Sequence, residues 1–159
     1  MSDKLIFSGI TEAQRLLIAH WAECRDSSGR VARESIDPGT VRSTLACLSI
    51  VEMDELGAGR FRIAGSRLRD IFGFDVRGRH VSEIAGTHGE CYALGLSAAI
   101  ERGLPVGGLM ESGSRLHAWL RLPLADDHGQ LTQVLCHDEL IASRRVIVPS
   151  PADTSRFAA

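Results

Sequence analysis

The sequence lacks several features that would narrow its function at once. Across 159 residues, no apolar run approaches the ~18 residues that a membrane-spanning helix needs. Met1-Ser2-Asp3-Lys4 does not lead into a basic region and a long apolar stretch, so we expect no signal peptide and a cytoplasmic protein. The 18 basic and 20 acidic residues leave a net charge of −2, which gives no global attraction to nucleic acid or an anionic membrane. Hydrophobic residues make up 44% and charged residues 24%, as in one ordinary globular domain.

Cysteine is scarce and scattered, which argues against a cysteine-based site. The four residues are Cys24, Cys47, Cys91 and Cys136, and no two of them have the C-x-x-C spacing of a zinc or thioredoxin-like motif. We therefore expect four free, buried thiols and neither a disulfide framework nor a metal site.

Lysine is almost absent, because Lys4 is the only one and every other basic residue is an arginine. Six arginines crowd the segment from Arg60 to Arg79, where Asp70 and Asp75 interrupt them. Codon usage in a GC-rich genome and a solvated surface explain this most simply. The alternative is a nucleotide or second-messenger site, since a guanidinium can hold phosphate or carboxylate through two parallel hydrogen bonds. The candidate anion-binding residues are Arg67, Arg69, Arg77 and Arg79.

Residues 11–26 have the pattern of an amphipathic helix. Thr11 and Gln14 fit a capping box, in which Thr11 caps the helix and Gln14 reaches back to it. One face of the helix carries Leu16, Leu17, His20, Trp21 and Cys24. This face either packs on the domain's own sheet or forms a homodimer interface. Both would hold if the helix packed on the sheet of a partner chain in a homodimer.

The remainder predicts a mixed α and β chain. Asp37-Pro38 indicates a second helix start, strands are expected at 48–53 and 60–63, and Phe61 and Ile63 should point to the same side. Helical turns broken at Gly73 and Gly78 precede a helix at 88–102 and strands at 106–111, 117–122 and 131–141. In the strand at 117–122, His117, Trp119 and Arg121 share one face, which we expect the N-terminal helix to cover.

The order of elements and several short motifs resemble a PAS domain. Phe61-Arg62-Ile63-Ala64-Gly65-Ser66-Arg67-Leu68, then Phe72-Gly73 and Gly78-Arg79, are similar to a short, stand-alone PAS subfamily common in alphaproteobacteria. Trp21 before a basic loop, Asp37-Pro38 and Leu120-Arg121-Leu122-Pro123-Leu124 fit it as well. The resemblance implies an α+β fold, in which a five-stranded antiparallel sheet carries helices on one face and an additional N-terminal helix. We expect a lead at 1–10, one domain at 11–145 and a disordered tail at 146–159.

The same resemblance implies a bacterial sensory or protein-interaction module rather than an enzyme. Signal would pass through a homodimer or a signalling protein partner, because no output domain fits in the remaining residues. Some PAS domains hold haem, flavin or a small metabolite between sheet and helices, and the sequence itself requires no cofactor. A small enzyme on a related cup-like scaffold, with a His or Asp as general base, is the alternative from another class.

A set of apolar and semi-polar residues is expected to face the interior: Phe61, Ile63, Ile71, Phe72, Tyr92, Leu109, Trp119 and Cys136. They form either a filled core or a pocket for a small apolar metabolite, in which the Tyr92 hydroxyl or Trp119 indole would orient the ligand. Only eight aromatic residues in the chain disfavour a large stacking pocket. Gly107 and Gly108 indicate a bulge or a close approach in their strand.

Other chemistry fits the sequence less well. His80 or His88 could ligate haem, but neither has a supporting motif. Cys91 lies near the position of a flavin-reactive cysteine, but Glu90 and Tyr92 flank it and the flavin motif is absent. His117, Asp138 and Ser112 could form a hydrolytic triad in principle, but no nucleophile elbow accompanies them. Strand alternation separates Asp138 from His137 and Glu139, which disfavours a metal site there.

Overall fold

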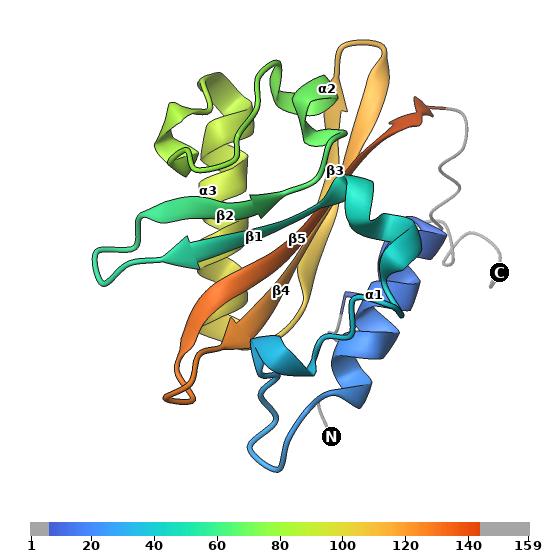
Figure 1. Cartoon of the computed structure of the whole chain (residues 1–159). Helices are drawn as coiled ribbons and strands as arrows, with labels where there is room; N and C mark the ends of the chain where they lie inside the picture. The colour runs from blue at the N-terminus through green and yellow to red at the C-terminus, as the bar shows by residue number, and fades with distance from the viewer. Residues whose placement is uncertain (1–6, 144–159) are drawn as a thin grey trace, which may run out of the picture.

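The computed structural model describes residues 7–143 and shows one five-stranded antiparallel sheet with helices on both faces (Figure 1). The strands are β1 (Leu48–Met53), β2 (Gly59–Ala64), β3 (Val106–Ser112), β4 (Arg115–Ala125) and β5 (Leu131–Ala142). Their spatial order is β2-β1-β5-β4-β3, so the C-terminal strand lies at the centre. The α+β fold with an N-terminal helix is therefore confirmed, whereas the expected tail at 146–159 and most of the lead lie outside the described residues.

The helical segments are mostly short. They are α1 (Glu12–Glu23), η2 (Arg33–Ser35), η3 (Arg42–Cys47), α2 (Leu68–Phe72), η4 (Val81–Glu83) and α3 (Gly86–Arg102). The α2 helix ends at Gly73 with φ 82° and α3 ends at Gly103 with φ 63°, the left-handed conformation that glycine adopts without strain. No helix among residues 7–143 is long and apolar enough to cross a membrane.

The helix α1 packs on the outer face of the sheet. Leu17 and Trp21 contact Leu120, Leu122 and Leu135 in a buried apolar cluster. The Trp21 indole N–H donates to the carbonyl oxygen of Pro123 at 2.9 Å, which fixes the helix over β4. The expected amphipathic helix is thus present, and its apolar side covers the sheet of its own chain.

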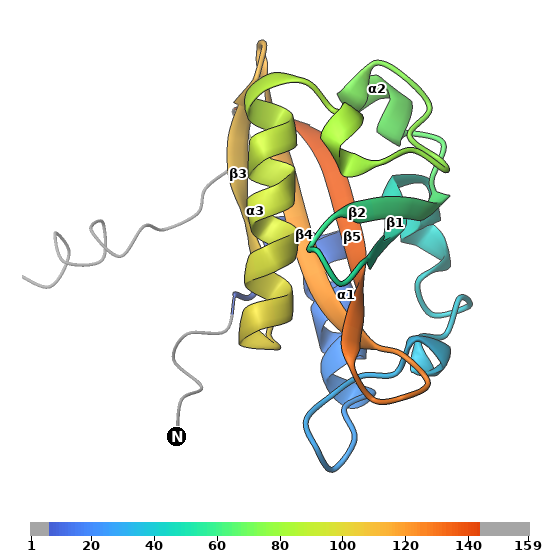
Figure 2. The same ribbon diagram turned by 90° about the vertical axis from the view of Figure 1, so that its left-hand side faces the viewer.

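The helix α3 covers the opposite, concave face, which we call the cup (Figure 2). Tyr92, Leu96 and Ala99 of α3 pack against Phe61 of β2 and Val134 of β5. The sequence-based expectation that the N-terminal helix covers Trp119 is wrong, because Trp119 faces α3. A Cβ added at Gly95 would lie 3.0 Å from the Trp119 ring, and a Cβ added at Gly108 would lie 3.1 Å from it. Close packing, one of the two predicted reasons for the Gly107-Gly108 pair, is confirmed, because β3 and β4 pair without a bulge.

Two further local expectations are wrong. Phe61 and Ile63 do not share a side, because a bulge in β2 pairs Val51 with Phe61 but Ile50 with Ile63. Ile63 consequently lies on the outer face and is 48% exposed. The second helix does not begin at Asp37-Pro38. Asp37 does accept the Gly39 N–H at 3.0 Å, but this caps a turn, and only the 3-10 helix η3 follows.

Candidate functional site

The centre of the cup holds a buried ionic network. Arg121 donates to both carboxylate oxygens of Asp138, at 2.9 and 3.1 Å, and His117 Nε2 lies 2.6 Å from the same carboxylate. All three side chains are at most 2% exposed. Arg121 on β4 and Asp138 on β5 meet because strand alternation turns both toward the cup.

Electrostatics keep the Arg121–Asp138 pair charged. Burial alone would raise the pKa of Asp138, but the Arg121 guanidinium and the His117 hydrogen bond bring that pKa below its ordinary value. Burial would likewise lower the pKa of Arg121, and the Asp138 carboxylate reverses this effect. A buried pair of this kind adds little net stability relative to apolar residues, but loss of either partner is costly.

Aromatic rings surround the network and fill the cup. The Arg121 guanidinium lies 3.9 Å from the centre of the Tyr92 ring, and the Tyr92 ring lies 5.4 Å from Phe61 and 5.6 Å from Phe72. The Tyr92 hydroxyl hydrogen-bonds Ser49 at 3.2 Å. These side chains fill the centre of the cup between α3 and the sheet.

Two unpartnered histidine nitrogens border the network. The His88 ring from α3 stacks on His117, with 5.7 Å between ring centres and 12° between planes. His88 Nε2 and His117 Nδ1 are buried without a hydrogen-bond partner among the described residues. Burial, and then the neighbouring His117, lower the pKa of His88. The lowered pKa favours the neutral form of His88 over the network, and His80 lies exposed at the surface.

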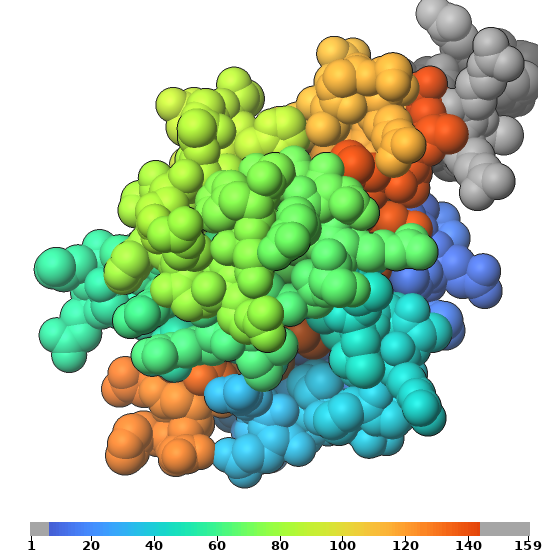
Figure 3. All heavy atoms as spheres, turned by 45° about the horizontal axis from the view of Figure 1, so that its top comes forward, coloured from blue at the N-terminus to red at the C-terminus, as the bar shows by residue number. Residues whose placement is uncertain are grey.

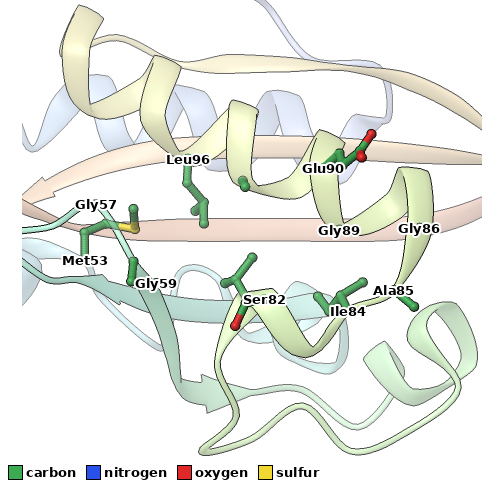
Figure 4. Close-up of a pocket in the computed structure, with 13 residues that line it drawn as sticks. Met53, Gly57, Gly59, Ser82, Ile84, Ala85, Gly86, Gly89, Glu90 and Leu96 are labelled. Carbon is green, nitrogen blue, oxygen red and sulfur yellow. The ribbon is translucent and has the colours of Figure 1, made fainter.

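Beside the filled cup lies a cleft of about 490 Å³, which we call the α3 cleft (Figure 4). It lies between α3, η4 and the turn joining β1 to β2. Its lining includes Met53, Gly59, Ser82, Ile84, Gly89 and Leu96. Two of these glycines are required by packing, since a Cβ would lie 2.9 Å from Val51 at Gly59 and 2.0 Å from the Ile84 carbonyl oxygen at Gly89.

The predicted pocket residues are only partly brought together. Phe61, Phe72, Tyr92 and Cys136 meet in the cup, and Ile71 packs at its edge. Trp119 joins them through Arg121, whose guanidinium lies 5.4 Å from its ring. Ile63 and Leu109 do not join them: the β2 bulge turns Ile63 outward, and Leu109 pairs with Ala118 on the outer face. None of the eight lines the α3 cleft, whose glycines and η4 residues sequence reasoning missed. Gly86 and Gly89, three residues apart, were the feature of the sequence that could have indicated this cleft.

The predicted anion-binding arginines are largely engaged by acids. Arg69 and Arg77 lie 3.9 and 3.3 Å from Asp75, and Arg79 lies 3.1 Å from Glu83. Arg67 instead faces a separate cleft beside α2. The structure therefore does not gather the four guanidinium groups around one space.

The predicted helix face divides between core and surface. Leu17 and Trp21 are 2% and 1% exposed, whereas Leu16 is 59% exposed. His20 accepts the Asp37 N–H at 3.0 Å, and the Cys24 thiol donates to the Ser35 carbonyl oxygen at 3.2 Å. Gln14 does not reach back to Thr11; its oxygen accepts the Ile10 N–H and its nitrogen meets His137. Leu17 and Trp21 consequently cannot form a dimer contact while α1 lies on its own sheet.

The disfavoured catalytic and metal sites can be placed as well. His117 and Asp138 do meet, but Ser112 pairs with Arg115 at the β3–β4 turn, away from both. The four cysteines are free, and only Cys136 is fully buried. Over residues 7–143, no three histidine, cysteine or acidic side chains group as metal ligands.

Several solved structures are similar to this chain. A light-oxygen-voltage domain studied with a flavin analogue is 11% identical with a TM-score of 0.50, over 76% of this chain and 90% of that one. A sensory box histidine kinase from Vibrio cholerae is 12% identical with a TM-score of 0.49, over 65% of this chain and 89% of that one. The PAS domain of the histidine kinase ThkA is 18% identical with a TM-score of 0.45, over 58% and 97%. A search of curated proteins finds no match.

A family model described as "PAS domain" matches residues 10–91, which is 82 of the 159 residues. The match runs from the start of α1 into α3 and includes every wall of the α3 cleft except the later part of that helix. At 11% identity the light-oxygen-voltage domain, with its TM-score of 0.50, shows the fold alone, and the family model covers more than half of the chain. The chain therefore belongs to the PAS domain family.

Proposed function

We propose that this PAS domain senses a small, mostly apolar ligand bound in the α3 cleft. The observation that supports this best is the cleft itself, about 490 Å³ in volume and open beside a filled cup. Ligand sites are typically concave and mainly apolar, with a few polar groups that orient the ligand. Met53, Ile84 and Leu96 would supply the apolar contact, and the Ser82 hydroxyl and Glu90 carboxylate would be the polar groups.

The chemistry of the lining selects the ligand class. Glu90 is the one charged side chain among the lining residues and is exposed at the rim, so an anionic ligand would be repelled. Gly57 and Gly59 leave the β1–β2 turn without side chains that would fill the space. A neutral metabolite of modest size, with one hydrogen-bond donor for Glu90, fits these features best.

The position of the cleft offers a route for the signal. Ile84 and Leu96 belong both to the cleft and to the buried cluster of the cup, so a ligand that moves them also presses on α3 and the sheet. The outer face of that sheet carries α1. Movement of the sheet against α1 would then change a homodimer contact made by the exposed side of α1, or the docking of a signalling protein.

One substitution in the cleft tests this proposal. Ala93 lines the cleft and is exposed, so Ala93→Trp should fill it without disturbing the core. Leu94, the next residue of α3, is 71% exposed and lies outside the cleft, so Leu94→Trp is the matched control. Native mass spectrometry of freshly purified protein should show a retained small mass in the parent and in Leu94→Trp but not in Ala93→Trp.

If native mass spectrometry of the parent shows only the mass of the polypeptide, a second measurement decides the proposal. Neutral apolar metabolites would then be added singly, and the melting temperature of the three proteins compared. Stabilisation of the parent and of Leu94→Trp, but not of Ala93→Trp, would support the α3 cleft. The absence of any such difference would contradict it.

A further inference from the structure

A second cleft, which we call the charged cleft, lies at the end of the sheet where α2 approaches β5. It has a volume of about 210 Å³ and shares no lining residue with the α3 cleft. Figure 3 views this end of the molecule, where the green α2 segment lies beside the teal η3 and the red end of β5. Its lining includes Arg67, Arg115, Asp70 and Glu139, and the fully buried Asp138 borders it.

A glycine brings two walls of this cleft together. At Gly65, a Cβ would stand 2.4 Å from the carbonyl oxygens of Leu45 and Ala46, so only glycine permits this approach. The Arg67 N–H then donates to the Ala46 carbonyl oxygen at 2.9 Å. The start of α2 is thereby held against η3, which places Arg67 and Cys47 in the lining of one space.

Charges of both signs line this space, and apart from Asp138, which Arg121 holds, they form no ion pair with one another. Some exposed charges elsewhere do pair, as Arg62 does with Glu52 at 3.0 Å. Across residues 7–143, no ion pair or side-chain hydrogen bond is formed by Arg67, Asp70 or Arg115. Glu139 approaches only His137, at 4.0 Å, and burial lowers the pKa of His137 to about 4, so this histidine is neutral at pH 7.

The balance of charges indicates what could occupy the cleft. A simple anion would meet the carboxylates of Asp70 and Glu139, and a simple cation would meet the guanidinium groups of Arg67 and Arg115. The fifth charged residue of the lining, Asp138, is neutralised by Arg121, and the other four charges sum to zero. A ligand that carries both signs is therefore the electrostatic complement. The volume of about 210 Å³ is below the ~300 Å³ at which sites for drug-sized ligands begin, which restricts the ligand to the size of an amino acid.

We propose that the charged cleft binds a small zwitterion of the amino-acid class. Its carboxylate would accept hydrogen bonds from Arg67 and Arg115, the geometry that a guanidinium favours. Its ammonium group would face Asp70 and Glu139. Because Asp138 borders the cleft and holds Arg121 and His117, the bound ammonium would also lie near the buried network of the cup.

The test uses the whole chain and the twenty free amino acids as probes. Thermal shift with each amino acid, followed by calorimetry, should identify at least one that raises the melting temperature and binds. Its N-acetyl derivative lacks the ammonium group and its carboxamide lacks the carboxylate, so each should bind at least tenfold more weakly. If none of the twenty binds, or if either derivative binds as tightly as the parent amino acid, the proposal is wrong.

Variants locate the site and separate it from the α3 cleft. Arg115→Gln and Asp70→Asn should each weaken binding at least tenfold, because each removes one unpaired charge from the cleft. Arg102→Gln, at the exposed end of α3, is the matched control and should leave the affinity unchanged. Ala93→Trp should also leave it unchanged, so this proposal and the proposed apolar site succeed or fail independently. Equal binding by Arg115→Gln and Asp70→Asn would place the amino acid elsewhere and overturn the assignment.

Discussion

Gln14 on α1 and His137 on β5 meet on the outer face of the sheet, with 3.3 Å between Gln14 Nε2 and His137 Nδ1. His137 is 2% exposed, and burial lowers its pKa to about 4. This polar contact joins the N-terminal helix to the central strand. It also makes the stability of the fold depend on pH. Below the ordinary pKa of histidine, an imidazole that is neutral and buried in the folded chain binds a proton when the chain unfolds.

We predict that the protein loses stability as the pH falls from about 6.5 to about 4. In this window the unfolded His137 binds a proton and the folded His137 does not, so protonation favours unfolding. The lowered pKa of His88 acts in the same direction. The lowering of the His137 pKa from its ordinary value to about 4 corresponds to a loss of about 3 kcal/mol of folding stability once the pH is well below both values.

Urea unfolding at pH 7 and pH 5 measures this dependence. His137→Gln should unfold at a lower urea concentration at pH 7, but its stability should change less between the two pH values than that of the parent. His128→Gln alters an exposed turn histidine and should keep the parent's dependence. An unchanged pH dependence in His137→Gln would show that His137 is not the group responsible.

We predict that Asp138→Asn is strongly destabilising. The substitution leaves the Arg121 guanidinium, 1% exposed, without its counter-charge. The cost of breaking a buried pair in this way is about 3–5 kcal/mol. Chemical denaturation of Asp138→Asn, Arg121→Met and the double variant gives the coupling between the two residues. The double variant should lose less stability than the two single variants added together; simple additivity would mean that the ion pair contributes nothing.

The cup shows why sequence patterns could locate the sheet but not the network. The alternation of Leu116, Ala118, Leu120 and Leu122 with His117, Trp119 and Arg121 predicts two covered faces of β4, and both are covered. Periodicity does not say which helix covers which face, and here the assignment was wrong. Arg121 and Asp138 meet through the pairing of β4 with β5, a register that local sequence does not specify.

The placement of Ile63 shows a second limit. Strict alternation puts Ile63 beside Phe61, but Arg62 is an additional residue in β2 relative to β1, and the bulge reverses the side. No glycine or proline at Arg62 signals this bulge in the sequence. The glycines of the α3 cleft and Gly65 were visible as residues, but their role depends on contacts with Val51, Ile84 and Ala46 that only the folded chain brings together.

We predict that the effect of Gly95→Ala changes sign with the residue at position 119. A Cβ at position 95 would lie 3.0 Å from the Trp119 ring and 3.4 Å from the Arg121 side chain. In the parent, Gly95→Ala should therefore destabilise by about 1–3 kcal/mol through overpacking. In a Trp119→Leu background only the 3.4 Å approach to Arg121 remains, which is close to an ordinary contact, and alanine in a helix interior is favoured over glycine by ~1 kcal/mol. The melting temperatures of the parent, Gly95→Ala, Trp119→Leu and the double variant decide this. A destabilising Gly95→Ala in both backgrounds would refute the packing explanation.

Leu16 and Leu17 separate the homodimer proposed through α1 from the stability of the chain. Leu17 is 2% exposed and packs against β4 and β5, so Leu17→Glu should unfold the protein or detach α1, whatever the oligomeric state. Leu16 is 59% exposed, so Leu16→Glu should leave the melting temperature of a monomer nearly unchanged. Light scattering should then show a dimer for the parent and a monomer for Leu16→Glu. Ala22→Glu, also exposed on α1, adds the same charge six residues further along the helix and is the control for charge alone. A Leu16→Glu protein that remains dimeric would place the interface on another surface, and α1 would then act only within its own chain.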